Sequence, residues 1–451
     1  MGARLTDSEL YGHLWGTPEL REIFDERARL ASWVEILATL GEVQADLGIV
    51  PAEAAAAIRQ HASVDRLDLV AVAEETRRTG HSTLGLIRGL RELLPPEGAE
   101  WVYYGITVQD LTDTWASLAL RRTGEVVWRD LFAIEGTLLE LAERTRDLPM
   151  AGRTHGQAGA PITLGFKAAG WADEVRRGLD RLREGAPRWL VGQLGGAVGT
   201  HGFFGEAGPE LRRRFCERLG LADPGISWTA SRDRVAEAGT TLASIASTLA
   251  RIGNEVYQLQ RGEIGELREP AGEAVVGSIT MPHKRNPEAS EHLVSLSRLA
   301  RAAAGTLLEG QVQEHERDGR GWKAEWVALP EVCLLTGTAA ALARTMIERL
   351  EIDEEAMARN LGRFAASEAV LAALAPRLGK HRAQELLQEA LSRGASAATL
   401  EEALRGHPEL ADVLDDEVLE AARGPAAGSA AAQVDEVLER IREARKDDRW
   451  R

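Results

Sequence analysis

The sequence predicts an all-α protein whose core is an elongated bundle of long helices. Several long segments repeat apolar side chains every three or four residues and contain no internal proline. Segments with the alternating pattern of strands are few. In residues 239–253, small and apolar side chains cover more than one side of the helix, which indicates that other helices surround it. We therefore expect a central bundle at 109–350, flanked by smaller helical domains at 1–108 and 351–451.

The N-terminal region is predicted to contain one long helix followed by shorter ones. Residues 18–48 have apolar side chains at helical spacing, and their charged side chains lie mostly off that face. Pro51 is expected in the first turn of the next helix, a position that proline favours. The pattern in 66–95 is interrupted at Gly80, which predicts two short helices there.

The central region is predicted to supply five long helices. Residues 109–147 contain no proline, and as a helix they would extend over roughly 55 Å. Five long helices with few strand signals are typical of an extended bundle. The other four are expected at 162–185, 233–268, 288–318 and near 330–350, and shorter helices are expected at 361–379, 383–391 and 430–445.

The composition excludes several classes of function. The net charge of −16 and the isoelectric point of about 5.3 argue against nucleic acid and anionic membranes as partners. Only Cys216 and Cys333 are present, so a disulfide framework and a spaced zinc set are not expected. The N-terminus is polar and no apolar run approaches membrane-spanning length, so we expect a cytoplasmic protein without a membrane segment.

The segment with the most chemical potential is 277–287, GSITMPHKRNP. Its glycine and prolines predict a loop between two helices. Lys284 and Asn286 are two residues apart, so in extended backbone they point the same way and could hold a carboxylate. Ser278 could then act on the atom next to that carboxylate. The alternative is a polar surface turn without a function.

This loop resembles the signature loop of the fumarase/aspartase superfamily, whose members catalyse anti β-elimination from succinyl-type substrates. The resemblance implies that Ser278 is the general base and that Met281, Lys284 and Asn286 bind the substrate. Ile279 stands where the family has a second serine, so one polar contact is missing.

Two further segments resemble the other conserved regions of that superfamily. In WVYYGITVQD, at 101–110, the resemblance implies that Thr107 and Gln109 bind substrate, while Val108 replaces an expected serine. The segment 153–157, RTHGQ, resembles the second region, in which members bind a carboxylate and assist proton transfer to the leaving group. It implies a catalytic role for His155 and substrate-binding roles for Arg153, Thr154 and Gln157. The alternative for His155 is a histidine that caps a helix.

Two residues are candidates with strong alternatives. His81 follows Gly80 and resembles the catalytic-site histidine that adenylosuccinate lyases carry in a Thr-x-His-Asp pattern, although Ser82 replaces the aspartate. A lone histidine is more often structural or on the surface. Arg232 precedes the predicted helix at 233–268 and could face a polyanionic substrate, but a surface salt bridge is equally compatible with the sequence.

The branch of the superfamily is indicated by residues 314–326. The EHER and WKAEW segments resemble 3-carboxy-cis,cis-muconate cycloisomerases, whereas adenylosuccinate lyases carry two serines and an arginine for phosphate here. Typical bacterial cycloisomerases lack the histidine at position 155, and retaining it fits members that expel a heteroatom. We therefore expect a lyase that splits a substituted succinate into fumarate and an amine or other heteroatom product. Cycloisomerisation is the second hypothesis, adenylosuccinate cleavage the third, and a non-catalytic crystallin-like oligomer the last.

The resemblance also implies how the chain assembles. Superfamily members associate into a tetramer with a twenty-helix core, so we expect a homotetramer that binds a small dicarboxylate and needs no metal, nucleotide or flavin. Thr107, His155 and Ser278 lie in separate regions near the ends of predicted long helices. We therefore expect active sites composed of segments from different chains.

Overall fold

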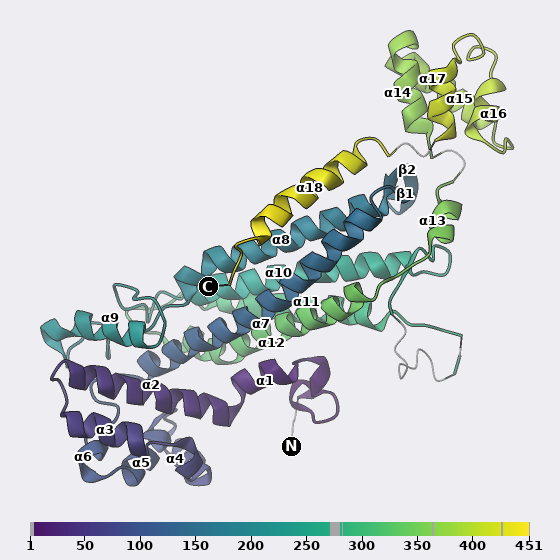
Figure 1. Cartoon of the computed structure of the whole chain (residues 1–451). Coiled ribbons are helices and arrows are strands. Elements are labelled where there is room, and N and C mark those ends of the chain that lie inside the picture. Colours follow the sequence, from purple (N-terminus) through teal and green to yellow (C-terminus); the bar gives the residue numbers. More distant parts are fainter. Residues whose placement is uncertain (1–3, 271–279, 282, 363–364, 425–426, 451) are drawn as a thin grey trace.

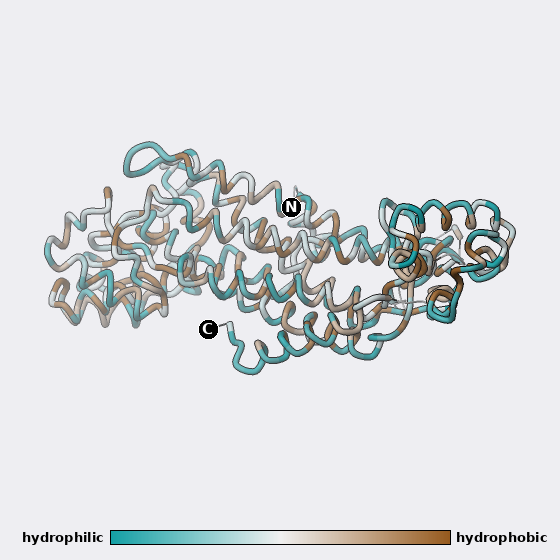
Figure 2. The backbone as a smooth tube through the Cα atoms, turned by 90° about the horizontal axis from the view of Figure 1, so that it is seen from above, coloured by the Kyte–Doolittle hydropathy of each residue, from teal (hydrophilic) through white to brown (hydrophobic). Residues whose placement is uncertain are grey.

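The structure is a computed structural model that describes residues 4–450 except 271–279, 282, 363–364 and 425–426. It confirms the all-α prediction: the described residues form a long, narrow molecule of helices with two small two-stranded sheets (Figure 1). The view from above shows the same elongation, with one group of helices set apart at one end (Figure 2). The central bundle consists of α7 (Val108–Arg144), α8 (Leu164–Trp189), α10 (Asp233–Leu259), α11 (Glu288–Glu309) and α12 (Gly319–Glu348).

The N-terminal helices lie at the end of the bundle where α7 begins (Figure 1). The helix predicted at 18–48 is two helices, because Asp25 interrupts it and its carboxylate accepts the backbone N–H groups of Arg27 and Ala28. Gly80 ends a helix with a φ of 64°, as expected of a glycine at a helix C-terminus. The helices are α1 (Pro18–Phe24), α2 (Glu26–Asp46), α3 (Ala52–His61), α4 (Leu69–Thr79), α5 (Leu84–Leu93) and α6 (Pro96–Ala99).

Small residues let α10 and α11 approach each other closely. A Cβ atom on Gly239 would lie 2.3 Å from Leu307, and one on Gly253 would lie 2.8 Å from Leu293. Both distances are shorter than any normal contact, so larger residues at these glycines would force the two helices apart. The prediction that 239–253 is enclosed by other helices is confirmed, since α10 also contacts α8 and α12.

Helix α12 begins earlier than its sequence pattern predicted. Its first residue is Gly319, the side chain of Asp318 caps it by accepting the N–H of Arg320, and Pro330 lies inside it. The expectation that no apolar run reaches membrane-spanning length was wrong for α12, which contains a window with a mean hydropathy of 1.5. Because 61% of that window is buried among other helices, α12 has the character of a bundle-core helix.

Two short antiparallel sheets connect the long helices. The strands β1 (Pro149–Thr154) and β2 (Gln157–Thr163) form a hairpin between α7 and α8. The strands β3 (Leu267–Arg268) and β4 (Glu351–Ile352) form the second pair, which joins the end of the α10 connection to the residues after α12. The remaining elements up to α12 are α9 (Gly208–Arg218), between α8 and α10, and four 3-10 turns along the chain: Leu5–Asp7, Gly12–Leu14, Val64–Arg66 and Gly205–Ala207.

The residues after 351 are divided between two hydrophobic cores. The four helices between 367 and 423 enclose a core of their own, built around Val370, Leu374 and Leu386. The last helix instead returns along α8, where Val434, Leu438 and Ile441 join the core of the central bundle (Figure 1). The helices are α13 (Glu354–Asn360), α14 (Ser367–Leu378), α15 (Lys380–Arg393), α16 (Leu400–Arg405), α17 (Asp416–Arg423) and α18 (Ala430–Arg445).

Buried ion pairs fix the end of the chain to the bundle. The guanidinium of Arg176 on α8 donates to Glu135 on α7 at 2.6 Å and also to Asp448, which follows α18. The side chains of Glu135 and Asp448 are fully buried, and Arg183 donates to Asp448 at 2.5 Å. Removing one partner would leave buried charge without compensation.

We predict that Asp448→Ala lowers the free energy of unfolding by about 3 kcal/mol, the usual cost of breaking a buried ion pair. Urea unfolding followed by circular dichroism at fixed protein concentration measures this change. The neighbouring Asp447 is exposed, so Asp447→Ala is the matched control and should change stability by less than about 0.5 kcal/mol. Equal stability of the two variants would show that the buried network contributes nothing.

Candidate active site

One group of candidate residues lies where α7 begins. Thr107 is the residue before α7, and its hydroxyl accepts a hydrogen bond from Nη1 of Arg317 at 2.7 Å. The guanidinium of Arg317 lies over the ring of Trp322, 5.5 Å from its centroid. The N-terminus of a long helix attracts anions, and the arginine adds a full positive charge. This end of α7 can therefore bind a carboxylate.

A cavity of about 480 Å³ lies beside this group and is lined in part by His81, Val108, Arg317 and Lys323. The Nδ1 atom of His81 accepts the backbone N–H groups of Thr83 at 3.4 Å and of Leu84 at 3.2 Å. The neutral imidazole therefore carries its hydrogen on Nε2. His81 is exposed, so it combines a role at the start of α5 with access to the cavity.

Asp110 holds the start of α7 against a glycine-rich loop. One carboxylate oxygen accepts the N–H of Gly195 at 2.9 Å, and the other accepts those of Gly196 at 3.0 Å and Thr107 at 2.9 Å. The side-chain amide of Gln193 adds a longer contact at 3.4 Å. Burial raises the pKa of Asp110 to about 7, although these donors act in the opposite direction. The carboxylate thus positions the backbone of Thr107.

Gln109 and Arg232, which were predicted to contact substrate, are both buried and bonded to other protein groups. Gln109 is buried, and its amide donates to the carbonyl of Thr229 at 2.7 Å, which leaves only its oxygen without a partner among the described residues. Arg232 is 2% exposed and donates to both oxygens of Asp113, at 2.8 and 3.1 Å, and to Glu325 at 2.9 Å. A substrate anion would have to displace one of these carboxylates. The placement favours a salt-bridge role for Arg232, in the core rather than on the surface.

The second group lies on the β1–β2 hairpin. His155 and Gly156 form its two-residue turn with φ angles of 52° and 76°, which is the geometry of a type I′ hairpin turn. A positive φ is unfavourable for histidine, and such strain is concentrated at functional sites. Thr154 pairs directly with Gln157, so the two side chains share one face of the hairpin. The side chains of Thr154, His155 and Gln157 can all form hydrogen bonds, and all three are exposed.

Arg153 anchors this hairpin instead of facing an open site. Its guanidinium donates to both oxygens of Glu266, at 2.9 and 2.6 Å, and the Glu266 side chain is fully buried. Asn360 on α13 donates to the same carboxylate at 2.8 Å. Because Glu266 immediately precedes β3, these bonds hold the hairpin close to the connection that leads to the signature loop. Arg153 therefore has a structural partner that a substrate would have to replace.

The described part of the signature loop leads directly into α11. Ser278 lies outside the described residues. Lys284 is exposed, and the described residues place no carboxylate within ion-pair distance of its ammonium. The amide of Asn286 donates to Glu288 at 3.3 Å, and Met281 is 42% exposed. Arg285 fixes the loop end by donating to Glu351 at 3.0 Å.

The two groups lie at opposite ends of α7. This helix has 37 residues and is therefore about 55 Å long. Thr107 precedes it, whereas the His155 hairpin follows it and lies near α13 at the other end of the bundle (Figure 1). Within the described residues, one chain does not bring Thr107 and His155 together. No group of three or more His, Cys, Asp or Glu side chains among these residues is arranged to hold a metal ion.

The sequence alone assigned no role to Arg317, Lys323 or the Asp110 carboxylate. Arg317 is part of the EHER segment, which served only to indicate a branch of the superfamily. Its contact with Thr107 joins residues 210 positions apart in the sequence. The sequence alone does not show that this arginine contacts a threonine at the start of a distant helix, so the structure is needed to find the pair.

Comparisons with known proteins agree on one family. A family model described as lyase matches residues 15–301. The chain is 38% identical to N-acetyl-S-(2-succino)cysteine lyase of Dickeya dadantii, over 97% of this chain and 98% of the relative. It is 38% identical to 3-carboxy-cis,cis-muconate cycloisomerase of Pseudomonas aeruginosa, over 86% of this chain and 85% of the relative. The crystal structure of a fumarate lyase from Mesorhizobium sp. BNC1 matches with a TM-score of 0.87 at 32% identity, over 95% and 99% of the two chains.

We predict that Asp110→Asn lowers both stability and activity. Both Asp110 oxygens accept backbone N–H groups, whereas asparagine has one oxygen and would direct an amide N–H at one of these donors. The unsatisfied contacts should cost about 1–3 kcal/mol in unfolding free energy.

Urea unfolding and kcat/KM on the substrate that proves active measure the two effects. Asp65→Asn is the control, because Asp65 makes a surface ion pair with Arg27, which is worth about 0–1 kcal/mol. Parental stability and activity of the Asp110→Asn protein would show that this carboxylate does not position Thr107.

Proposed function

The chain belongs to the lyase family that the matched model describes, within the fumarase/aspartase superfamily, and from this premise we propose the reaction that it catalyses. It is a lyase, and the proposed reaction is anti β-elimination from a substituted succinate, in which a carbon–sulfur or carbon–nitrogen bond breaks and fumarate forms. The leading substrate is N-acetyl-S-(2-succino)cysteine. The observation that carries this choice is the near full-length similarity to a lyase of that name.

In the proposed mechanism, Ser278 removes a proton from the carbon next to one carboxylate of the succinyl group. The C–H electron pair moves toward that carboxylate, which develops the charge of an aci-carboxylate, and then forms the double bond as the bond to sulfur breaks. Cations and hydrogen-bond donors that are fixed in place stabilise this charge. Lys284 and Asn286 are suited to one carboxylate, and Thr107 with Arg317 is suited to the other.

Substrates with a carbon–sulfur bond and those with a carbon–nitrogen bond differ in whether the leaving atom needs a proton. A thiol has a pKa of about 8.5, so a thiolate can leave with little help from an acid. An amine has to be protonated as its bond breaks, which requires a proton donor near the leaving atom. His155 and His81 are the candidates for this proton, and both are exposed in the isolated chain. The sulfur reaction therefore makes the smaller demand on the site.

Cycloisomerisation of 3-carboxy-cis,cis-muconate is the second candidate, because the chain has similar identity to such an enzyme and carries the EHER segment. Cleavage of adenylosuccinate is less compatible with the residues present. Trp322 and Trp326 occupy the segment where that branch has hydroxyls and an arginine, and Trp322 is buried. A phosphate there would lose charge-assisted hydrogen bonds worth about 1.5–3 kcal/mol each.

We also propose that the enzyme is a cytoplasmic homotetramer whose sites combine residues of several chains. The separation of Thr107 from the His155 hairpin by the length of α7 supports composite sites, since both groups are proposed to bind one small substrate. Exposed apolar side chains on neighbouring parts of α11 and α12 provide surface for such contacts: Leu299, Leu308, Trp326 and Val327.

The proposed reaction predicts that the purified protein converts N-acetyl-S-(2-succino)cysteine into fumarate and N-acetylcysteine. Ultraviolet absorbance measures fumarate, and a thiol reagent measures the second product. Ser278→Ala should lower kcat at least about 10²-fold, because it removes the proton acceptor, while helical content stays parental. The panel should include an N-substituted aspartate, 3-carboxy-cis,cis-muconate and adenylosuccinate. The highest kcat/KM on one of the last two, or parental activity of Ser278→Ala, would refute the proposal.

Composite sites predict that two inactive variants restore activity when their chains are mixed. One variant is Ser278→Ala, and the other combines Thr107→Val with Arg317→Met to remove the carboxylate contacts at the far end of α7. After the subunits are dissociated and reassembled together, hybrid sites with both groups intact should recover up to about a quarter of parental activity, in proportion to the statistics of random mixing. No recovery despite proven subunit exchange would show that each site comes from one chain.

A further inference from the structure

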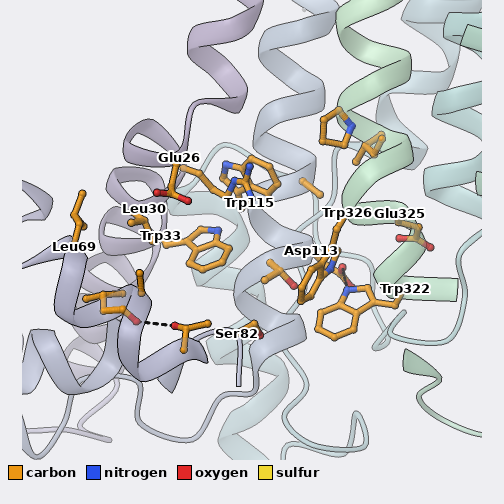
Figure 3. A pocket seen from close by; sticks show the side chains of 18 of the residues that line it. Glu26, Leu30, Trp33, Leu69, Ser82, Asp113, Trp115, Trp322, Glu325 and Trp326 are labelled. Carbon is orange, nitrogen blue, oxygen red and sulfur yellow. Dashed lines mark hydrogen bonds between the residues drawn. The ribbon is translucent and has the colours of Figure 1, made fainter. Parts of the chain in front are cut away.

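A second cavity, of about 410 Å³, lies between the N-terminal helices and the first turns of α7 and α12. Helices α2 and α4 form one wall and α7 and α12 form the other. Four indole rings gather around this chamber, those of Trp33, Trp115, Trp322 and Trp326 (Figure 3). Leucine and valine side chains of α2 and α4 complete a mostly apolar lining. Such a lining with a few polar groups is typical of a small-molecule site.

The chamber adjoins the cavity that contains His81 and Arg317. The two cavities share four lining residues, namely Thr76, Ser82, Trp322 and Trp326. A ligand with its reacting end beside Thr107 can therefore extend its other end past the tryptophans into the chamber. In the proposed reaction, Thr107, Arg317 and the signature loop hold the two carboxylates of the succinyl group. The part of the substrate that extends into the chamber is therefore the leaving group.

Three buried polar atoms of the chamber have no partner among the described residues. The Nε1 atom of Trp33, the Nε atom of Arg29 and the Oγ1 atom of Thr112 are buried and make no hydrogen bond within the described residues. Trp33 is only 8% exposed. Burial lowers the pKa of Arg29, whose guanidinium lies 5.0 Å from the centroid of the Trp115 ring. These donors would be satisfied by a ligand with a carbonyl or carboxylate oxygen.

Three acids line the chamber, namely Glu26, Asp113 and Glu325. Each has an arginine nearby: the charge of Glu26 raises the pKa of Arg29, against the effect of burial, and the other two pair with Arg232. Both oxygens of Asp113 and both of Glu325 accept hydrogen bonds from Arg232, and the indole N–H of Trp322 also donates to Asp113 at 3.3 Å. The chamber thus combines aromatic walls, donors without partners among the described residues, and acids that have arginine partners. This combination fits an apolar group attached through an amide or carboxylate.

We propose that this chamber is the subsite for the leaving group, and that it accepts an N-acyl group larger than acetyl on the thiol or amine that is expelled. The inference rests on the proposed function and specifies its substrate class as succinyl adducts of N-acylated amino thiols with an apolar acyl chain. The amide carbonyl and the carboxylate of such a leaving group meet the donors of Trp33 and Arg29, and the acyl chain lies among the four indoles.

A series of substrates with longer acyl chains tests this subsite. For N-acetyl, N-butanoyl and N-hexanoyl-S-(2-succino)cysteine, kcat/KM should rise by about fourfold for each methylene that enters the chamber. Ala73→Phe on α4 narrows the chamber and should lower kcat/KM for the hexanoyl substrate more than for the acetyl substrate, so that the gain with chain length is lost. Ala71→Phe is the matched control, since Ala71 lies on the same helix but is exposed. A flat or falling series in the parental enzyme, or an unchanged series in Ala73→Phe, would overturn the subsite.

Binding of the products separates this inference from the reaction itself. Titration of N-acetylcysteine and N-hexanoylcysteine, followed by tryptophan fluorescence, should give tighter binding of the hexanoyl compound. Trp33→Phe keeps an aromatic ring but loses the N–H, and should weaken binding of both compounds by about five- to tenfold. If no succinyl substrate reacts but this dependence is found, the proposed reaction fails and the subsite stands. If N-acetyl-S-(2-succino)cysteine reacts but product binding does not depend on the length of the acyl chain, the subsite fails and the reaction stands.

Discussion

The length and rigidity of α7 constrain everything else about the candidate site. A single uninterrupted helix of 37 residues separates Thr107 from the His155 hairpin by about 55 Å. Buried contacts with α8 and α12 hold this helix along the bundle, so bending cannot bring its ends together. If both groups act on one small dicarboxylate, they have to come from different copies of the chain. Under the proposed function, assembly of several copies is therefore a condition of catalysis.

Each end of α7 is held in place by a buried carboxylate with several donors. Asp110 accepts three backbone N–H groups and fixes Thr107, while Glu266 accepts Arg153 and Asn360 and fixes the hairpin. The residues left exposed beside these anchors are those suited to chemistry, namely Thr154, His155, Gln157 and Lys284. Although the net charge of the protein is −16, Arg317 beside Thr107 and the exposed Lys284 each provide a local positive charge for an anionic substrate.

The periodicity of the sequence predicted most of the long helices, because their apolar faces follow helical spacing and glycine marks their close approaches. The glycine at position 80 correctly predicted the end of a helix. The start of α12 was predicted too late because Pro330 was expected to lie at a helix start, whereas the structure has this proline inside the helix. The hairpin at His155 was not predicted because its strands are short and its turn is not one of the usual sequences. The return of α18 to the bundle depends on pairing between Arg176 and Asp448, which are distant in the sequence.

Motifs identified the candidate site residues, but the structure is needed to tell which of them already have charged partners among the described residues. Arg153 and Arg232 have the same charge as Lys284, yet each already donates to buried carboxylates. Conversely, Arg317 acquires its proposed role solely from its contact with Thr107. Pattern reasoning cannot see these pairings, because each one joins segments separated by about a hundred residues or more.

A crystal or electron cryomicroscopy structure of the Ser278→Ala protein with N-acetyl-S-(2-succino)cysteine bound tests the central claim most directly. The account predicts one succinyl group contacted by Thr107 of one chain, by the His155 hairpin of a second and by Lys284 of a signature loop that does not belong to the chain supplying Thr107. A ligand held entirely by residues of one chain, or one bound away from Thr107 and Lys284, would contradict it.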